Sequence, residues 1–261
     1  MTTLFQRTLV GCAAVLSLNG ARKTLRVYGP RGPAAAMKEA AASFEEATGM
    51  TVRVTAGPTA AWLADAKRDA DLVYTGAEAM TSDVVTGLGN ELTPMPPEPL
   101  YLRAMAILVR PDNPKKIGCF TDVLKPGIKV LVVKAAGHDG AWEYVAGRTG
   151  DIEKVTRLRS NIVGYAKTGA EACQTWIADP QIDVWLTWNT WRAANPTLAN
   201  AVPIEPEHAI YRDTSVAITL RGQTNSASKQ FLAYLKSKEG AAIFYKWGWM
   251  EPRSALAANC L

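Results

Sequence analysis

The chain has 261 residues, a formal net charge of +5, and hydrophobic residues at 48% of its positions. This length fits one large domain or two small lobes, and the composition is that of an ordinary globular protein. Lysine and arginine are dispersed with no run of five or more, which argues against a nucleic-acid partner. A mildly basic chain is compatible with an anionic small ligand.

The first 21 residues differ from the rest of the chain. They contain one arginine, Arg7, and no acid, and residues 8–18 are uninterrupted by charge. This apolar stretch is too short to span a bilayer as a stable helix. The pattern predicts a secretory signal peptide over residues 1–21, cleaved near Ala21. Cys12 follows Leu9, Val10 and Gly11, which leaves a lipoprotein processing site open as an alternative.

Residues 27–49, VYGPRGPAAAMKEAAASFEEATG, predict a short strand, a tight turn and an amphipathic helix. Gly29 and Gly32 are expected to let the backbone turn, Pro33 suits the first helical position, and Gly49 ends the helix. Met37, Ala41, Phe44 and Ala47 fall on one face of that helix. The turn aims free backbone N–H groups and the positive end of a helix dipole above the strand, which makes an anion site. No nucleotide motif is present.

Strand and helix patterns alternate along the rest of the chain, which predicts parallel sheets covered by helices. The predicted strands cover residues 51–55, 70–75, 100–109, 129–133, 162–166, 182–188 and 215–220. The predicted helices cover residues 61–69, 80–87, a segment through 142–145, 151–160, 169–178 with a capping box at Thr168, a short segment ending near Pro196, 225–237 and 239–247.

Two long strands, near 104 and 216, bracket the middle of the chain. This arrangement predicts two discontinuous lobes joined by two crossings, one made of residues 22–105 with 216–261 and the other of residues 106–215. Ligands of open parallel sheets bind at the carboxyl ends of strands. The turns at 29–33, 75–78, 137–140 and 188–189 all follow predicted strands, so we expect them to meet at one cleft between the lobes.

Four cysteines are too few for a disulfide scaffold, and no Cys-x-x-Cys motif occurs. Cys12 leaves with the signal peptide and Cys260 is near the end of the sequence. Cys119 and Cys173 are candidates for a disulfide in an oxidising compartment. The two histidines, His138 and His208, are far apart in the sequence, so neither a metal site nor another cofactor is expected.

Several blocks of the sequence carry a resemblance to a known family. These are YGPRGPAAAMKEAAASFEEATG, VTAGPT, DADLVYTGAEAMTSD, EPLYLRAMAILVRPDNPKKI, LKPGIKVLVV, WLTWNTWRAANP, IYRDTSVAIT and KSKEGAAIFYKWGW. Together they resemble the accessory colonisation factor C proteins over nearly all of residues 25–249. The resemblance implies export to the periplasm, a two-lobed α/β fold of the type II periplasmic binding proteins, and capture of a small anionic solute. The family's first loop has a glycine where this chain has Arg31.

By analogy with molybdate-binding proteins of similar architecture, the resemblance also implies which loops contact the ligand. The expected ligand-binding residues are Tyr28, Gly29, Arg31, Gly32 and Pro33 in the first loop, Thr75, Gly76 and Glu78 in the second, His138, Asp139 and Gly140 in the third, then Trp188, Asn189 and Tyr211.

Each of these side chains also has a structural interpretation. The Thr75 hydroxyl either donates to an oxyanion or caps the following turn, and Arg31 points either to the ligand or to solvent. His138 is either a donor to the ligand or a loop histidine bonded to the backbone. Trp188 and Asn189 either wall the site or anchor the following helix.

Other side chains have a mainly structural interpretation. Trp185 alternates into a buried strand face and is expected in the core, and His208 is expected to be structural. Arg212 and Asp213 precede the return crossing and suggest a salt bridge at a hinge.

The sequence therefore predicts a monomeric binding protein that presents a sulfate-like oxyanion or a small carboxylate to an importer permease or a chemoreceptor. A hydrolase or transferase on the same scaffold is the alternative, although no nucleophile motif is present. The acids near the cleft loops bear on the ligand. If Glu78, Asp139 and Asp213 all face away, a fully ionised oxyanion is favoured. If one faces inward, a phosphate or an amino acid is favoured, because either brings a proton to donate.

Overall fold

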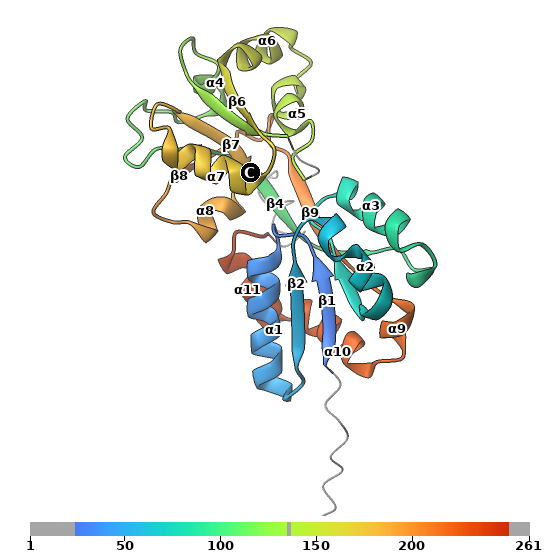
Figure 1. Cartoon of the computed structure of the whole chain (residues 1–261). Coiled ribbons are helices and arrows are strands. Elements are labelled where there is room, and N and C mark those ends of the chain that lie inside the picture. Colours follow the sequence, from blue (N-terminus) through green and yellow to red (C-terminus); the bar gives the residue numbers. More distant parts are fainter. Residues whose placement is uncertain (1–23, 135–136, 251–261) are drawn as a thin grey trace, which may run out of the picture.

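The computed structural model describes residues 24–134 and 137–250 (Figure 1). The described elements form two groups, each with a β-sheet covered by helices, and strands β4 (Glu98–Val109) and β9 (Tyr211–Ile218) lie where the groups meet. The mixed α/β architecture agrees with the sequence-based prediction. The predicted signal peptide, with Cys12, and the last cysteine, Cys260, lie outside the described residues.

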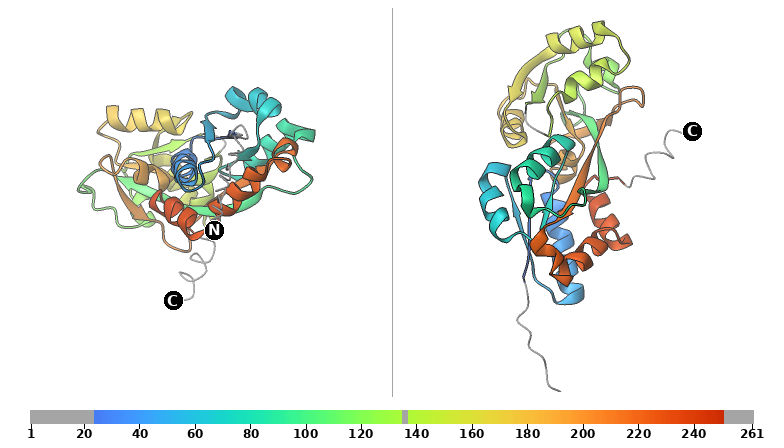
Figure 2. Two further views of the ribbon diagram at one scale, coloured as in Figure 1. Left: turned by 90° about the horizontal axis from the view of Figure 1, so that it is seen from below. Right: turned by 90° about the vertical axis from the view of Figure 1, so that its right-hand side faces the viewer.

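The first group contains the strand order β2-β1-β3-β9-β4. Strand β1 is parallel to β2 and β3, whereas β9 is antiparallel to both β3 and β4. Helices α2 and α3 cover one side of this sheet, and α1, α10 and α11 cover the other (Figure 2). The remaining elements of this group are β1 (Leu25–Gly29), α1 (Ala34–Thr48), β2 (Val52–Ala56), α2 (Thr59–Asp69), β3 (Leu72–Tyr74), α3 (Glu78–Leu88), a 3-10 turn (Gly89–Glu91), α9 (Leu220–Gln223), α10 (Ser226–Leu235) and α11 (Lys238–Lys246).

The second group continues the sheet from the far end of β4. There β4 is antiparallel to β7 and β8, and β5 is parallel to β6 and β7. Helices α4, α5 and α6 pack on one face of these strands and α7 packs on the other. The elements are α4 (Phe120–Val123), β5 (Val130–Val133), α5 (Ala141–Gly147), α6 (Ile152–Asn161), β6 (Ile162–Ala166), α7 (Gly169–Ala178), β7 (Val184–Trp188), α8 (Thr190–Ala194) and β8 (Asn200–Pro203).

Strand β4 belongs to both groups. Ala104 pairs with Tyr211 of β9, and the next residue, Met105, pairs with Trp188 of β7. One continuous strand therefore leaves one sheet and enters the other between these two residues, and the residues just before this point lie beside both groups.

The prediction of parallel sheets is wrong for every pairing that involves β4 or β9, because all of these are antiparallel. Alternation of strands and helices constrains how consecutive strands connect, but the direction of a long returning strand is decided by its distant partner. Strand β9 also begins at Tyr211, before the predicted start at 215. The short elements α4, β8 and α9 were not predicted, since elements of four residues carry little periodic signal.

The first helix follows its prediction closely. Helix α1 begins at Ala34, with Pro33 in the N-cap position, and Gly49 ends it in the left-handed conformation at φ 69°. Met37, Ala41 and Phe44 are buried in the core as expected, whereas Ala47 is exposed near the end of the helix. The capping box at Thr168 is also confirmed, because its side chain accepts a hydrogen bond from Glu171 N at 3.1 Å.

The candidate disulfide between Cys119 and Cys173 is not formed, and both residues are free thiols. Cys119 precedes α4 and donates to Asp122 Oδ2 at 3.5 Å, whereas Cys173 lies on α7. Because α4 and α7 pack on opposite faces of the second sheet, the sheet separates the two thiols. None of the helices in the described part of the chain is long and apolar enough to cross a membrane.

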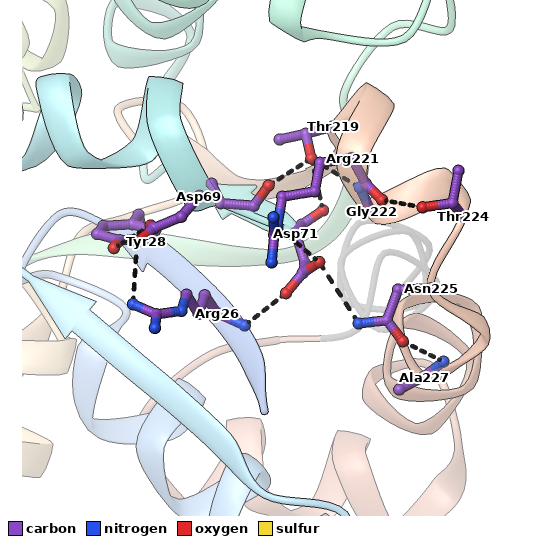
Figure 3. A network of polar contacts seen from close by, with 11 residues as sticks. Arg26, Tyr28, Asp69, Asp71, Thr219, Arg221, Gly222, Thr224, Asn225 and Ala227 are labelled. Carbon is purple, nitrogen blue, oxygen red and sulfur yellow. Dashed lines mark hydrogen bonds and ion pairs between the residues drawn. The ribbon is translucent and has the colours of Figure 1, made fainter. Parts of the chain in front are cut away.

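A network around Asp71 ties together the end of the first sheet where β3 begins (Figure 3). The buried Asp71 carboxylate accepts from Arg26 N at 2.9 Å and lies 3.6 Å from Arg221 Nε. Thr219 Oγ1 donates to Ala70 O at 2.6 Å. A Cβ added to Gly222 would lie 2.0 Å from Asp71 O, so α9 packs directly on the backbone before β3. These contacts fix β1, β3 and α9 relative to one another, at the end of β3 opposite its carboxyl end.

Candidate functional site

Arg103 is the side chain on which the predicted ligand loops meet. It lies on β4 just before the strand passes into the second group, and it is 3% exposed. Its Nη2 donates to Gly76 O at 2.6 Å. Its guanidinium lies over two indole rings, 4.7 Å from the centre of Trp188 and 5.3 Å from the centre of Trp249. Both groups of elements therefore contribute to the surroundings of one cation.

Glycines of three predicted loops allow the backbone to approach this guanidinium. A Cβ added to Gly32 would lie 2.9 Å from Arg103 Nη1, and one added to Gly76 would lie 3.6 Å from Nη2. A Cβ added to Gly137, which belongs to the third loop, would lie 3.4 Å from Nη2. The convergence expected for the first three loops is thus found around Arg103.

Arg103 carries a buried charge with no anionic partner. Among the described residues, no carboxylate lies within ion-pair distance of it, and its Nε has no hydrogen-bond partner. Burial lowers the pKa of Arg103 to about 9, with Asp213 opposing this shift and Arg212 adding to it. Burying a charge without a partner is costly, so an anion placed beside this guanidinium would remove a large part of that cost.

His138 occupies the second group's side of the same site. Its Nε2 lies 2.9 Å from Thr187 Oγ1, and its ring centre lies 5.6 Å from that of Trp188. Burial, and after it the charge of Arg103, lower the pKa of His138 to about 3. The imidazole is therefore neutral at physiological pH, and it bonds the Thr187 hydroxyl, whereas the sequence analysis left a ligand and a backbone group open as its partner.

Trp188 and Asn189, at the end of β7, have different roles. Trp188 is fully buried, donates from Nε1 to Gly137 O at 2.9 Å, and lies under Arg103. Asn189 donates from Nδ2 to Gly248 O at 2.7 Å, while its Oδ1 is buried with no partner in the described chain. Trp188 thus forms part of the wall around Arg103, whereas Asn189 anchors the segment after α11.

Thr75 is buried directly after β3, but its hydroxyl hydrogen is already used. Thr75 Oγ1 and Thr81 Oγ1 are 2.7 Å apart, and Thr81 Oγ1 donates to Ala77 O at 3.2 Å. Because a hydroxyl has one hydrogen, Thr75 must donate to Thr81. In this state Thr75 fixes the first turn of α3 and does not present a donor to a ligand.

A cavity of about 1080 Å³ is lined by residues of both groups, and Arg103 itself is not among the lining residues. It is lined by Leu102 next to Arg103 on β4, by Ala77 next to Gly76, and by residues of α5 and the start of β9. The predicted site residues Glu78, Asp139 and Tyr211 line it, together with Asp213. All three acids that the sequence analysis singled out therefore belong to the lining of this cavity.

Other predicted site residues lie outside this group. The Tyr28 hydroxyl donates to Asp69 Oδ1 at 2.6 Å beneath α2, and Arg31 is exposed. A Cβ on Gly29 would lie 2.5 Å from the Tyr74 ring, so this glycine is needed for packing and not for the turn that the sequence suggested. Pro33 packs against Gly76, and Gly140 begins α5 with φ 64°.

The remaining residues with sequence-based interpretations are structural. Trp185 is buried in the core, as predicted. His208 is buried and bonds Val145 O and Lys154 Nζ, which agrees with its structural interpretation. The suggested salt bridge between Arg212 and Asp213 is not formed, because the Asp213 carboxylate instead accepts from Ser215 Oγ. No cluster of His, Cys, Asp or Glu able to hold a metal ion occurs within residues 24–134 and 137–250.

Residues 25–250 match the family model described as bacterial extracellular solute-binding protein. The chain belongs to this family. Solved structures similar to it include PEB3 from Campylobacter jejuni, which is 34% identical with a TM-score of 0.79 over 87% of this chain and 99% of that chain. Another PEB3 structure, described as bound to L-phospholactate, is 33% identical with a TM-score of 0.78 over the same shares of both chains.

The sulfate-binding protein SubI from Mycobacterium tuberculosis shares the fold, with 16% identity and a TM-score of 0.69 over 90% of this chain and 89% of that chain. The architecture is that of the type II periplasmic binding proteins, as predicted. The sulfate-binding protein of Escherichia coli K12 is 27% identical over 178 residues, which is 61% of this chain and 54% of the relative. The chain therefore spans about half the length of the curated relatives it matches.

Membership in the extracellular solute-binding family implies a periplasmic location and fits a binding protein better than an enzyme.

Proposed function

We propose that this solute-binding protein captures a small anion against Arg103 and delivers it to the permease of an ABC importer. The observation that carries the proposal is a fully buried guanidinium, contacted by three ligand loops, with no anionic partner among the described residues. Charge-assisted hydrogen bonds from a guanidinium are strong and suit phosphate or carboxylate oxygens. Gly32, Gly76, His138 and Trp188 would surround the bound anion.

The descriptions of the relatives suggest two kinds of ligand for this chain. The curated relatives are sulfate-binding proteins, and a PEB3 structure is described with L-phospholactate bound. The cavity of about 1080 Å³ is far larger than one tetrahedral oxyanion. Its lining includes Glu78, Asp139 and Asp213, whose carboxylates can accept hydrogen bonds from a protonated group of a ligand. The size of the cavity favours a small organic anion over sulfate, and the acids favour one that keeps a proton to donate, such as an organic phosphate.

Calorimetric titration with sulfate, phosphate, L-lactate and L-phospholactate tests the proposal. At least one of these anions should bind the wild-type protein, and Arg103→Gln should weaken its binding by at least tenfold. Arg110 provides a matched control, because it also stacks on a tryptophan ring, at 3.6 Å from the centre of Trp176, outside this site. Unchanged anion affinity in Arg103→Gln, measured on folded protein, would remove the basis of the proposal.

We also propose that the two lobes predicted from the sequence close around the ligand. Pairing of β9 with the first half of β4 from Tyr211 onward supports a second crossing just before Tyr211, slightly earlier than the predicted boundary at 216. Small-angle X-ray scattering should give a smaller radius of gyration at saturating ligand. An unchanged radius with a ligand that calorimetry shows to bind would contradict closure.

The resemblance to the accessory colonisation factor C proteins remains a proposal about the subgroup to which this chain belongs. A chemoreceptor is the alternative partner, and a monomer is the expected state. An enzyme on this scaffold remains the alternative function. Turnover of any of the four anions on incubation with the protein would support it, whereas their recovery unchanged supports binding alone.

A further inference from the structure

A second arginine lies directly beside Arg103 in the sheet. Arg103 on β4 and Arg212 on β9 are cross-strand partners in an antiparallel pairing, so their side chains leave the same face of the sheet. Like charges placed directly opposite each other in a sheet are destabilising. Arg212 contributes to lowering the pKa of Arg103, which agrees with this proximity.

Neither arginine of this pair forms an ion pair with an acid in the part of the chain that the structure describes. Within the described part of the chain Arg212 forms no ion pair, and its polar contact is from Nη1 to the neighbouring Tyr211 O at 3.2 Å. Its guanidinium lies 5.6 Å from the centre of the Tyr144 ring on α5. Arg212 therefore spans from the first sheet to a helix of the second group while its charge stays unpaired.

Arg212 and Tyr144 both line the large cavity, and so do Leu102 and Ala77, the sequence neighbours of Arg103 and Gly76. Some of the acids in this lining are already engaged. Glu143 lies 3.5 Å from Arg159, and the Asp213 carboxylate accepts from Ser215 Oγ. Glu78 and Asp139 are exposed, so water and salt screen them more than they screen the half-buried Arg212. Two neighbouring cations at the junction of the groups thus form no ion pair with any acid among the described residues.

We propose that Arg212 is a second anion-binding residue and that the site selects a short organic ligand with two anionic groups, one on Arg103 and one on Arg212. This inference rests on the proposed capture of an anion at Arg103. Such a ligand places one anionic group on each member of the like-charged pair.

The test compares one-headed and two-headed anions by calorimetry on the wild-type protein. L-phospholactate carries a phosphate and a carboxylate, and inorganic phosphate and L-lactate each supply one of these groups. We expect L-phospholactate to bind at least tenfold more tightly than either of the single-headed anions. Arg212→Gln should reduce that preference to less than threefold and change phosphate affinity by less than threefold, while Arg212→Lys should keep part of the preference.

Arg192→Gln is the matched control, because it removes one exposed positive charge from α8 without lining the cavity. It should leave the preference for the two-headed anion intact. Equal wild-type affinities for one-headed and two-headed anions would overturn the role of Arg212 while leaving the Arg103 site in place. An equal loss of affinity for all the anions in Arg212→Gln would also overturn the role of Arg212, because it would be a general effect of removing a positive charge. Failure of every anion to bind the wild-type protein would instead refute the proposed function.

Discussion

Replacing Arg103 with methionine tests whether this arginine binds a ligand or only stabilises the fold. Methionine keeps the apolar bulk of the side chain between Trp188 and Trp249 and removes the charge. The lowered pKa of Arg103, about 9, corresponds to about 5 kcal/mol of unfavourable free energy for holding this charge in the folded protein. Arg103→Met has no charge at this position, so its folded state lacks this unfavourable free energy.

The same substitution also removes favourable contacts. The hydrogen bond from the charged guanidinium to Gly76 O contributes about 1.5–3 kcal/mol, and stacking on two indole rings contributes about 1–2 kcal/mol. The relief of about 5 kcal/mol and the losses of about 2.5–5 kcal/mol largely offset each other, so Arg103→Met should leave the free energy of unfolding unchanged or raise it by up to about 2.5 kcal/mol. A buried arginine with an acidic partner would instead cost about 3–5 kcal/mol.

Arg110→Met is the matched control. Arg110 also stacks on a tryptophan, but its guanidinium donates to three backbone carbonyls, those of Ile182, Trp176 and Asp179, at 2.8, 2.9 and 2.5 Å. Losing these bonds should cost about 2–4 kcal/mol while leaving anion affinity unchanged.

Urea unfolding of both variants and the wild type measures these differences, with and without a ligand identified by calorimetry. At a ligand concentration one hundred times its Kd, the wild type and Arg110→Met should each gain about 2.7 kcal/mol, and Arg103→Met should gain almost none. A loss of 3 kcal/mol or more in Arg103→Met without ligand would show that Arg103 has a structural partner, and the reasoning would then be wrong.

Three further predictions concern stability and the cysteines. Burial lowers the folded-state pKa of His138 to about 3, so the stability that its neutral form contributes is complete above about pH 6.5 and is lost as the pH falls towards 3. Between pH 7 and pH 4.5, the free energy of unfolding measured by urea titration should drop by roughly 2–3 kcal/mol more in the wild type than in His138→Gln. Gly222→Ala should destabilise the protein by roughly 1–3 kcal/mol in thermal or urea unfolding, because its Cβ would lie 2.0 Å from Asp71 O. Gly147→Ala should be nearly neutral, because its Cβ would lie 3.6 Å from its nearest neighbour. Cys119 and Cys173 should both react with a thiol reagent in unfolded protein without reductant, and intact mass that shows neither labelled would contradict the free thiols of the structure.

Much of the fold was predictable because its long elements carry strong local patterns. The strand, turn and helix between β1 and Gly49 follow from alternating apolar residues, a proline at the helix start and a glycine at its end. The convergence of the loops after β1, β3 and β5 was also predictable, since it follows from the direction of strands that are parallel.

Arg103 was missed, although one local signal pointed to it. It stands alone as a charged residue within the apolar strand YLRAMAILV, and a charge inside a buried strand needs a partner or a function. Asn189 and Tyr28 were predicted at the site, but their partners are Gly248, 59 positions away, and Asp69, 41 positions away. No local pattern announces partners at such separations, so the sequence could not tell a ligand contact from an anchor.

The sequence by itself determined the local elements, the positions of the loops that follow the parallel strands, and the general class of protein, because these depend on periodicity and turn residues within short windows. Only the tertiary structure decided that β4 and β9 run antiparallel where the two groups meet. This pairing makes Arg103 and Arg212 cross-strand neighbours. Neither strand carries a sign of this pairing. The partners are 109 positions apart, and their register results from the packing of the whole sheet between its two layers of helices.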